Sequence, residues 1–292
     1  MSLIIKRSPM YTAIQLLHYR AFCGSERKAT KMNEIIALNI WQFALVYLLL
    51  FIVLIIMKVC KINQTKLLLV ASIRMTIQLV LAGLALTYIF DNPRPLFTVL
   101  YLLLMTGFAI YTVLSRNREN KTLNKRFKII TGVSLTATGF LIVGFFILVI
   151  VGVNLFNPQY TIPISGMIIG NAMTGMSLGL RAFNENIQSN KSQIDTLLNL
   201  GATPRKILLP FVNRALETAL LPTLNSMLGM GIISLPGMMT GQILSGTTPM
   251  TAILYQISIL ISICSVTCMS VFCTLYIGYR TLYNKRYQIN WL

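Results

Sequence analysis

Methionine is the residue whose clustering in this sequence most clearly indicates metal chemistry. Eight of the 15 methionines fall between residues 167 and 250, and they are Met167, Met173, Met176, Met227, Met230, Met238, Met239 and Met250. Thioether sulfur is a soft ligand that favours copper(I) and hardly discriminates for hard trivalent cations. Methionine also fills irregular gaps between helices that slide past one another. The cluster has two interpretations, the lining of a metal route and helix packing, and the sequence leaves both open.

Groups that catalyse reactions are scarce. Of the seven acidic residues only Glu217 falls within a predicted membrane span, and the single histidine, His18, lies near the N-terminus. This argues against a histidine metal site, a nucleophile–histidine pair and a membrane-embedded hydrolase. The sequence has no G-x-x-x-x-G-K-[ST], the usual cradle for nucleotide phosphates. We expect a protein that is not an enzyme and binds no cofactor, and that is either passive or driven by ATP and Mg²⁺ on a separate subunit.

Composition places the chain in a membrane. Hydrophobic residues make up 55% of the sequence and charged residues 11%, and several uncharged runs reach the roughly 20 residues that a helix needs to cross hydrocarbon. The sequence predicts an all-α integral membrane protein, multi-pass, with about seven transmembrane helices and no soluble domain. The predicted spans are residues 35–57, 67–90, 96–115, 129–153, 162–180, 207–233 and 250–276.

Basic residues in the loops predict the orientation of these spans. Lysine and arginine number three in residues 58–66, six in 115–128, five in 181–214 and three in 280–292, while the alternate loops hold only Arg94. Such an excess marks cytoplasmic loops, so the C-terminus is predicted to be cytoplasmic and the N-terminus outside. The net charge of +18 therefore indicates loops beside anionic membrane lipid, not nucleic-acid binding.

Residues 1–31 form a basic tail that conflicts with this topology. The tail carries six basic residues against Glu26 alone and has no long apolar run. A secretory signal needs a longer apolar region, whereas an arginine-containing segment poor in acids also fits organelle targeting. The predicted topology would place the six basic residues outside, against the positive-inside rule. We expect an upstream-extended start, with Met32 as the true first residue and a membrane domain over residues 32–292.

The fifth predicted span carries two pairs of small residues spaced for close helix packing, and they are Gly166, Gly170, Gly175 and Gly179. At about 100° per residue the second pair lies almost opposite the first. One face is therefore predicted to meet a helix of the same chain and the other a second protomer. Asn171 shares the face of the second pair. An amide in mid-membrane either bonds between packed helices or lines a water-filled path, and both interpretations stay open.

A helix–elbow–helix is predicted at about residues 193–206. A short amphipathic segment, residues 193–200, ends in Gly201-Ala202-Thr203-Pro204, and apolar sequence resumes at Ile207. Glycine stops a helix and proline fits the first turn of the next one. Asp195 is expected in the first turn of the short helix, where a carboxylate complements the helix dipole. An elbow of this kind can be pushed from outside by a partner protein.

From Asp195 to Pro210 the sequence reads D-T-L-L-N-L-G-A-T-P-R-K-I-L-L-P. It resembles the cytoplasmic coupling loop of ABC-transporter permeases, E-A-A-x-x-x-G followed by Leu-Pro, with Asp195, Thr196 and Leu197 in place of E-A-A. The flanking stretches I-P-I-S-G-M-I-I-G-N-A-M from Ile162 and S-L-P-G-M-M-T-G from Ser234 are similar to the FetB/YbbM-type permeases. That family includes bacterial metal exporters and plant aluminium-tolerance half-transporters. The similarity covers about Met32 to the C-terminus.

The resemblance implies a permease subunit of an ABC transporter in the cell (inner) membrane, working as a homodimer with a separate ATPase and exporting a metal ion, iron-like. The implied coupling residues are Asp195, Thr196, Leu197, Gly201, Ala202, Thr203 and Pro204. The predicted pathway residues are Asn171, Met167, Met173, Asn225, Met238 and Met239. Two alternatives stay open, a nucleotide-independent channel or secondary carrier, and a non-transporting membrane partner of an ATPase.

Overall fold

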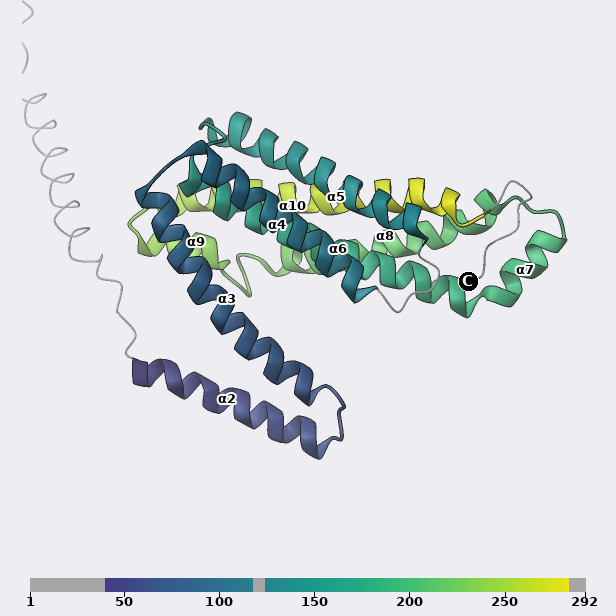
Figure 1. The fold of residues 1–292 in the computed structure, drawn as a ribbon, viewed down its shortest axis with the longest axis horizontal. Coiled ribbons are helices and arrows are strands. Elements are labelled where there is room, and N and C mark those ends of the chain that lie inside the picture. Colours follow the sequence, from purple (N-terminus) through teal and green to yellow (C-terminus); the bar gives the residue numbers. More distant parts are fainter. Residues whose placement is uncertain (1–39, 118–123, 284–292) are drawn as a thin grey trace, which may run out of the picture. The chain divides into compact units, whose positions relative to one another are not determined.

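The computed structural model describes residues 40–117 and 124–283, which fold almost entirely into helices (Figure 1). An isolated β-bridge joins Met230 and Ser234. The predicted all-α class is confirmed. The basic tail predicted for residues 1–31 and the start of the first predicted span lie outside the described residues.

Five helices of the described chain are long and apolar enough to cross a membrane, at Thr65–Asp91, Pro95–Arg116, Lys125–Val151, Pro204–Gly229 and Pro249–Thr281. Each overlaps one of the predicted spans. The two remaining predicted spans fall on α2 (Ile40–Val59), whose apolar stretch is the shorter Leu45–Val59, and on α6 (Pro158–Ser189). α6 is long enough, but its many small and polar residues lower its hydropathy. The structure thus supports five spans, and seven spans with the stated orientation stay a prediction.

The first of two compact units comprises the described residues up to Ile77 and residues 235–256. It holds α2, the first half of α3 (Thr65–Asp91), the short α9 (Gly237–Leu244) and the start of α10 (Pro249–Gly278). The hydroxyl oxygens of Tyr47 on α2 and Thr76 on α3 lie 2.6 Å apart. This hydrogen bond joins two largely apolar helices, and such bonds favour helix association in lipid.

The second unit comprises residues 78–234 and the described chain from Ile257 onward, and it contains the candidate site. Its helices are the rest of α3 and α10, α4 (Pro95–Arg116), α5 (Lys125–Phe145), α6, α7 (Lys191–Asn199) and α8 (Pro204–Gly229). α5 continues as a π-helical turn, η1 (Phe146–Val151), and α10 as a 3₁₀ turn, η2 (Tyr279–Thr281). α6 packs against α4, α5 and α8. Ile168, Ala172 and Met176 of α6 have no exposed surface, so this helix forms the centre of the unit.

Glycines bring α6 close to α8 and α10. A Cβ atom built on Gly175 would lie 3.3 Å from the carbonyl oxygen of Ala219 and would overlap the methyl group of Thr267. One built on Gly179 would lie 3.0 Å from Cγ1 of Val271 and 3.2 Å from Cβ of Ala219. Because small residues let helix backbones approach, van der Waals contact replaces the hydrophobic effect that is missing in lipid.

The other glycine pair of α6 has more room. A Cβ atom on Gly166 would lie 3.7 Å from Sδ of Met105 on α4, an ordinary contact, and one on Gly170 would have no neighbour within 4 Å. The Gly175–Gly179 face therefore packs within this chain, and the surface at Gly170 is open.

The packing predicts that valine destabilises the protein at a tightly packed glycine and not at a glycine in open space. Gly175→Val should lower the free energy of unfolding by about 1–3 kcal/mol, since the new methyl groups overlap Thr267 and the Ala219 carbonyl. Gly144→Val, on α5, places the same side chain in open space and is the matched control. Thermal unfolding of the detergent-solubilised chain measures both. Equal melting temperatures for the two variants would contradict the close approach.

Candidate functional site

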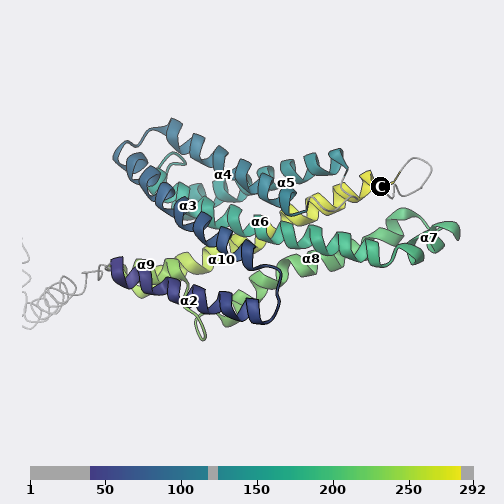
Figure 2. The same ribbon diagram turned by 60° about the horizontal axis from the view of Figure 1, so that its bottom comes forward.

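A short helix joins the ends of α6 and α8. α7 runs Lys191–Asn199 and α8 begins at Pro204, so the amphipathic segment predicted at residues 193–200 is largely helical. Figures 1 and 2 both show α7 beyond the far ends of α6 and α8. α7 packs against these two helices, which leaves its outer surface open to a partner.

Gly201 ends α7 with a hydrogen-bonded turn. Its φ of 85° lies in the left-handed region, which glycine adopts without a Cβ clash. The amide of Gly201 donates to the Leu198 carbonyl and the amide of Ala202 to the Leu197 carbonyl, both at 3.0 Å. These are the two bonds of a Schellman motif. Pro204 then opens α8, so the helix stop and start lie where the sequence placed them.

The expectation that Asp195 lies in the first turn of this helix is wrong. α7 begins at Lys191, and its first turn contains no acidic residue. The earlier start carries a local signal, because Asn190, the N-cap residue of α7, is followed three residues later by Gln193, the spacing of a capping box. Asp195 is half-buried near the middle of α7, and its carboxylate is too far along the helix to complement the N-terminal dipole, whose effect falls off within the first turn.

Two contacts fix the elbow to the helix bundle. Ile194, at the centre of α7, has no exposed surface. In the first turn of α8, Nη2 of Arg205 donates to the hydroxyl oxygen of Tyr276 on α10 at 3.2 Å. The Tyr276 ring stacks on Phe272 with centroids 5.0 Å apart and meets Tyr279 edge-on at 5.9 Å. Since aromatic pairs of this geometry stabilise beyond their buried area, Arg205 is held against a rigid aromatic cluster.

Leu200 protrudes from the turn. Its side chain is 78% exposed, next to the left-handed Gly201. A large aliphatic side chain held at the tip of a fixed turn is suited to fill a pocket on a partner surface.

The last turns of α6 carry an ion pair. Nε of Arg181 donates to Oε1 of Glu185 at 2.7 Å, and this hydrogen bond, followed by the charge of Glu185, raises the pKa of Arg181. Both side chains are well exposed, so the pair contributes little to stability.

A small polar groove of about 90 Å³ lies among α6, α8 and α10, and it is lined by Asn171, Thr174, Gly175, Ala219, Pro222, Thr223, Ser226, Leu260 and Ile263. Gly175 lies in the wall of this groove, at the point where α6 approaches α8 and α10. Pro222 has no amide hydrogen and cannot donate to the carbonyl of Thr218. The helical hydrogen bonding of α8 is therefore interrupted at the groove wall.

Three polar side chains of the groove each donate one hydrogen to their own helix. Asn171 donates from Nδ2 to the Met167 carbonyl at 2.7 Å, Thr174 donates to the Gly170 carbonyl at 3.2 Å, and Ser226 donates to the Pro222 carbonyl at 2.9 Å. A carbonyl only accepts, so these hydrogens point at the backbone, whereas the side-chain oxygen lone pairs and the second amide hydrogen of Asn171 stay available. The groove therefore offers neutral oxygen acceptors, which suit water and hard cations better than soft ones.

Comparison with known proteins identifies the family. A family model described as "Uncharacterised protein family (UPF0014)" matches residues 40–283. The chain belongs to this family. Resemblance to the FetB/YbbM-type permeases is thereby confirmed, and no solved structure matches.

Three relatives show what the UPF0014 chain is similar to. A UPF0014 membrane protein of Synechocystis is 36% identical over 78% of this chain and 87% of its own length. "Protein ALUMINUM SENSITIVE 3" of Arabidopsis thaliana is 35% identical over 74% of this chain and 77% of its own. "Probable iron export permease protein FetB" of Escherichia coli is 33% identical over 74% of this chain and 81% of its own length. The residues matched by the family model, 40–283, include both the elbow and the groove-forming helices.

Of the predicted pathway residues in the second unit of the UPF0014 chain, Asn171 alone lines the groove. Asn171 lines the groove, but Asn225, exposed on α8, does not. Met167 and Met173 are half-buried on α6 outside the groove lining, and Met238 and Met239 are half-buried on α9 in the first unit. Within the described residues no group of three or more His, Cys, Asp or Glu is placed to hold a metal ion. Oxygen, not sulfur, is thus the polar atom that this groove presents.

Sequence reasoning missed several residues that the structure makes prominent. Thr174, Thr223 and Ser226 line the groove with Asn171. Thr174 lies three residues after Asn171 and Ser226 lies four after Pro222, so helical spacing could have identified them. The contact between Arg205 and Tyr276 joins residues 71 positions apart, and no local pattern signals it.

Loss of the Tyr276 hydroxyl should loosen the elbow locally, because this group accepts the hydrogen bond of Arg205. Tyr276→Phe removes the acceptor for Arg205 and keeps the stacked ring, so the lost hydrogen bond costs about 1 kcal/mol. Amide hydrogen exchange in residues 191–208 should rise about fivefold. Tyr111→Phe, on the exposed surface of α4, removes a tyrosine hydroxyl elsewhere and is the control. Unchanged exchange in Tyr276→Phe would show that the aromatic cluster does not hold the elbow.

Proposed function

We propose that this chain is the membrane-spanning permease subunit of an ABC transporter in the cell membrane, and that it exports a metal ion, iron-like, with energy from ATP hydrolysed on a separate subunit. The observation that carries the proposal is the elbow. The buried Ile194 and the hydrogen bond of Arg205 hold it against the helix bundle, and the exposed Leu200 lies at its turn. A rigid projection can transmit force from a partner to the helices that hold it. The relative named as a probable iron export permease supports the transport assignment and the cargo.

The elbow is connected to the groove through continuous helices. α7 follows α6 and precedes α8, and both helices contribute groove residues, Asn171 and Thr174 from α6 and Ser226 from α8. The missing hydrogen bond at Pro222 makes α8 easier to bend beside the groove. We infer that closure of the ATPase subunits pushes the α7 elbow, tilts α6 and α8, and opens the groove.

Exposed polar groups support a homodimer. Asn171, Thr174 and Ser226 are exposed in the single chain, although they lie well inside long helices. Polar groups at membrane depth face protein or a water-filled cavity. A second copy placed against the open surface at Gly170 would cover them and close a pathway between the protomers.

Substitution of Leu200 tests docking. Leu200→Asp should abolish co-purification of a co-expressed ABC ATPase and lower ATP-dependent metal flux in proteoliposomes at least tenfold, because a carboxylate cannot enter an apolar pocket without loss of hydration. Leu200→Met keeps an aliphatic side chain of similar volume and is the control. Iron(II) and iron(III) are supplied separately as the transported ions.

Three results would oppose the proposal. Full flux with Leu200→Asp would exclude α7 as the docking element. Flux from the chain alone, without ATPase or nucleotide, would make it a channel or carrier. ATPase binding without flux of any metal would make the chain a non-transporting partner.

A pair of asparagine substitutions tests the pathway. Asn171→Leu replaces the groove amide with an apolar side chain and should lower flux at least tenfold without loss of ATPase binding. Asn225→Leu makes the same change on the exposed surface of α8 outside the groove and should keep most of the flux. If Asn225→Leu stops flux and Asn171→Leu does not, the pathway lies on the surface of α8 and the groove is structural.

A further inference from the structure

A second groove lies between α4 and α5 and has a different chemistry. It has a volume of about 590 Å³ and is lined by Ile110, Leu114, Lys128, Ile129, Gly132, Val133, Thr136 and Ala137. Its wall is almost wholly apolar, because Thr136, the only hydroxyl in it, donates to the Gly132 carbonyl at 2.8 Å. Pockets for small organic ligands range over about 300–1,000 Å³, so the groove is large enough for a flexible hydrocarbon chain.

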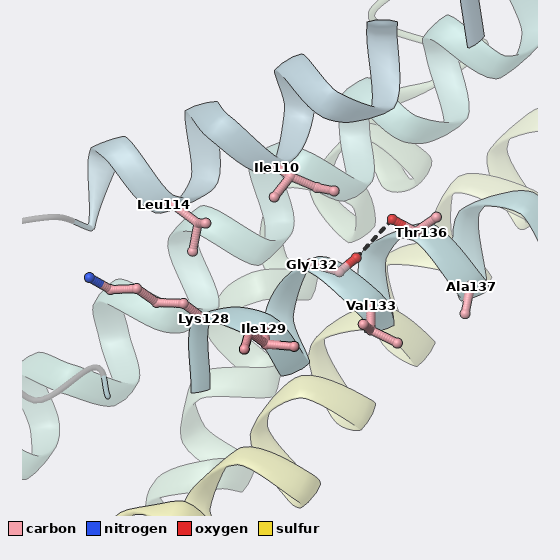
Figure 3. Close-up of a pocket in the computed structure, with 8 residues that line it drawn as sticks. All are labelled: Ile110, Leu114, Lys128, Ile129, Gly132, Val133, Thr136 and Ala137. Carbon is pink, nitrogen blue, oxygen red and sulfur yellow. Dashed lines mark hydrogen bonds between the residues drawn. The ribbon is translucent and has the colours of Figure 1, made fainter. Parts of the chain in front are cut away.

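The charge of this groove is confined to one end. Figure 3 shows Lys128 beside Leu114 at one end of the groove, and Thr136 and Ala137 at the other. Lys128 is half-buried, and in the described part of the chain no carboxylate pairs with it. Lys125 and Arg126 are exposed on the same helical turn. A lysine at a helix end extends along apolar surface and keeps its ammonium group in the polar interface.

The backbone adds to this positive end. α5 begins at Lys125, its first turn contains no acidic residue, and the side chain of its N-cap residue Asn124 does not bond to the amides of that turn. Uncapped amides at a helix N-terminus and the helix dipole both attract anions. The N-terminal end is also held in place, because Asn124 donates from Nδ2 to the Thr281 carbonyl at 3.3 Å and the Phe127 ring packs against Gly278.

We propose that this groove binds an anionic phospholipid of the membrane. One acyl chain lies along Ile129, Gly132 and Val133, and the headgroup phosphate lies at the N-terminus of α5 beside Lys128. α4 and α5 are both long and apolar enough to cross a membrane, so the groove faces hydrocarbon along its length and its basic end reaches the level of the headgroups. Anionic lipid matches both halves of the groove, the apolar wall and the basic end. This binding site is independent of the proposed transport cargo.

A second copy of the chain fits this surface less well. Two protomers related by a two-fold axis along the membrane normal would have the same orientation, so an interface on this groove would bring both basic ends to one depth. Lys125, Arg126 and Lys128 of each copy would then face the same residues of the other. Like charges in contact destabilise such an interface, whereas a phosphate is complementary to them.

The test is native mass spectrometry of the full-length chain, extracted from vesicles of phosphatidylcholine containing phosphatidylglycerol. Wild-type chain should keep phosphatidylglycerol in preference to phosphatidylcholine. Lys128→Gln should lower that preference about fivefold, the effect of one basic residue at an anionic surface. Lys66→Gln, an exposed lysine at the start of α3, is the charge control and should match wild type.

The apolar wall is tested separately. A Cβ atom on Gly132 lies 3.5 Å from Ile110, so Gly132→Leu extends into the groove and should prevent retention of the lipid. Gly144→Leu, with open space on the same helix, should retain it. Free glycerol phosphate should not displace bound phosphatidylglycerol, because it has no acyl chain to occupy the wall.

Three results would overturn the assignment. The first is an unchanged lipid preference in Lys128→Gln, and the second is equal lipid retention in the two leucine variants. The third is conversion of a dimer to a monomer by Gly132→Leu with lipid retention unchanged, which would assign the groove to a second copy.

Discussion

The close approach of α6 to α8 and α10 is the constraint on which the second unit depends. Gly175 and Gly179 have no room for a Cβ atom against Ala219, Thr267 and Val271. Helices that fit this tightly have few alternative arrangements, because packed interiors are bistable and not continuously deformable. A displacement of α7 therefore shifts α6 and α8 together, and the shift reaches the groove where α8 lacks a backbone hydrogen bond.

The parts of the fold that sequence predicted are those that short stretches determine. Gly201 and Pro204 act through their own backbone, glycine by accepting φ of 85° and proline by its fixed φ, so the elbow could be located within a few residues. The start of α7 was placed too late, although Asn190 and Gln193 have the spacing of a capping box, because the prediction followed the hydrophobic periodicity that begins at Ile194. The sequence predicted a membrane span at residues 162–180, and a helix, α6, lies there. Its glycine, asparagine and threonine residues lower its average hydropathy, so it is not among the five helices of the described chain that are apolar enough to cross a membrane.

The groove depends on contacts that the sequence does not reveal. The methionine cluster allowed a metal route lined by sulfur, but Met176 is packed in the core and no methionine lines the groove. Asn171 was identified because an amide is conspicuous in an apolar span. Thr174 and Ser226 were not, since small hydroxyl residues are common in membrane helices and usually bond to their own backbone. Only the position of α6 against α8 brings the three together.

The composition of the groove also bears on competition by protons. None of the residues that line it carries an ionisable side chain, and amide and hydroxyl oxygens keep the same protonation state across the physiological pH range. A proton therefore cannot displace a cation from the groove by titrating its ligands, as it can at carboxylate or histidine sites. If the groove holds the proposed cargo, its ligands do not titrate when one side of the membrane is acidified.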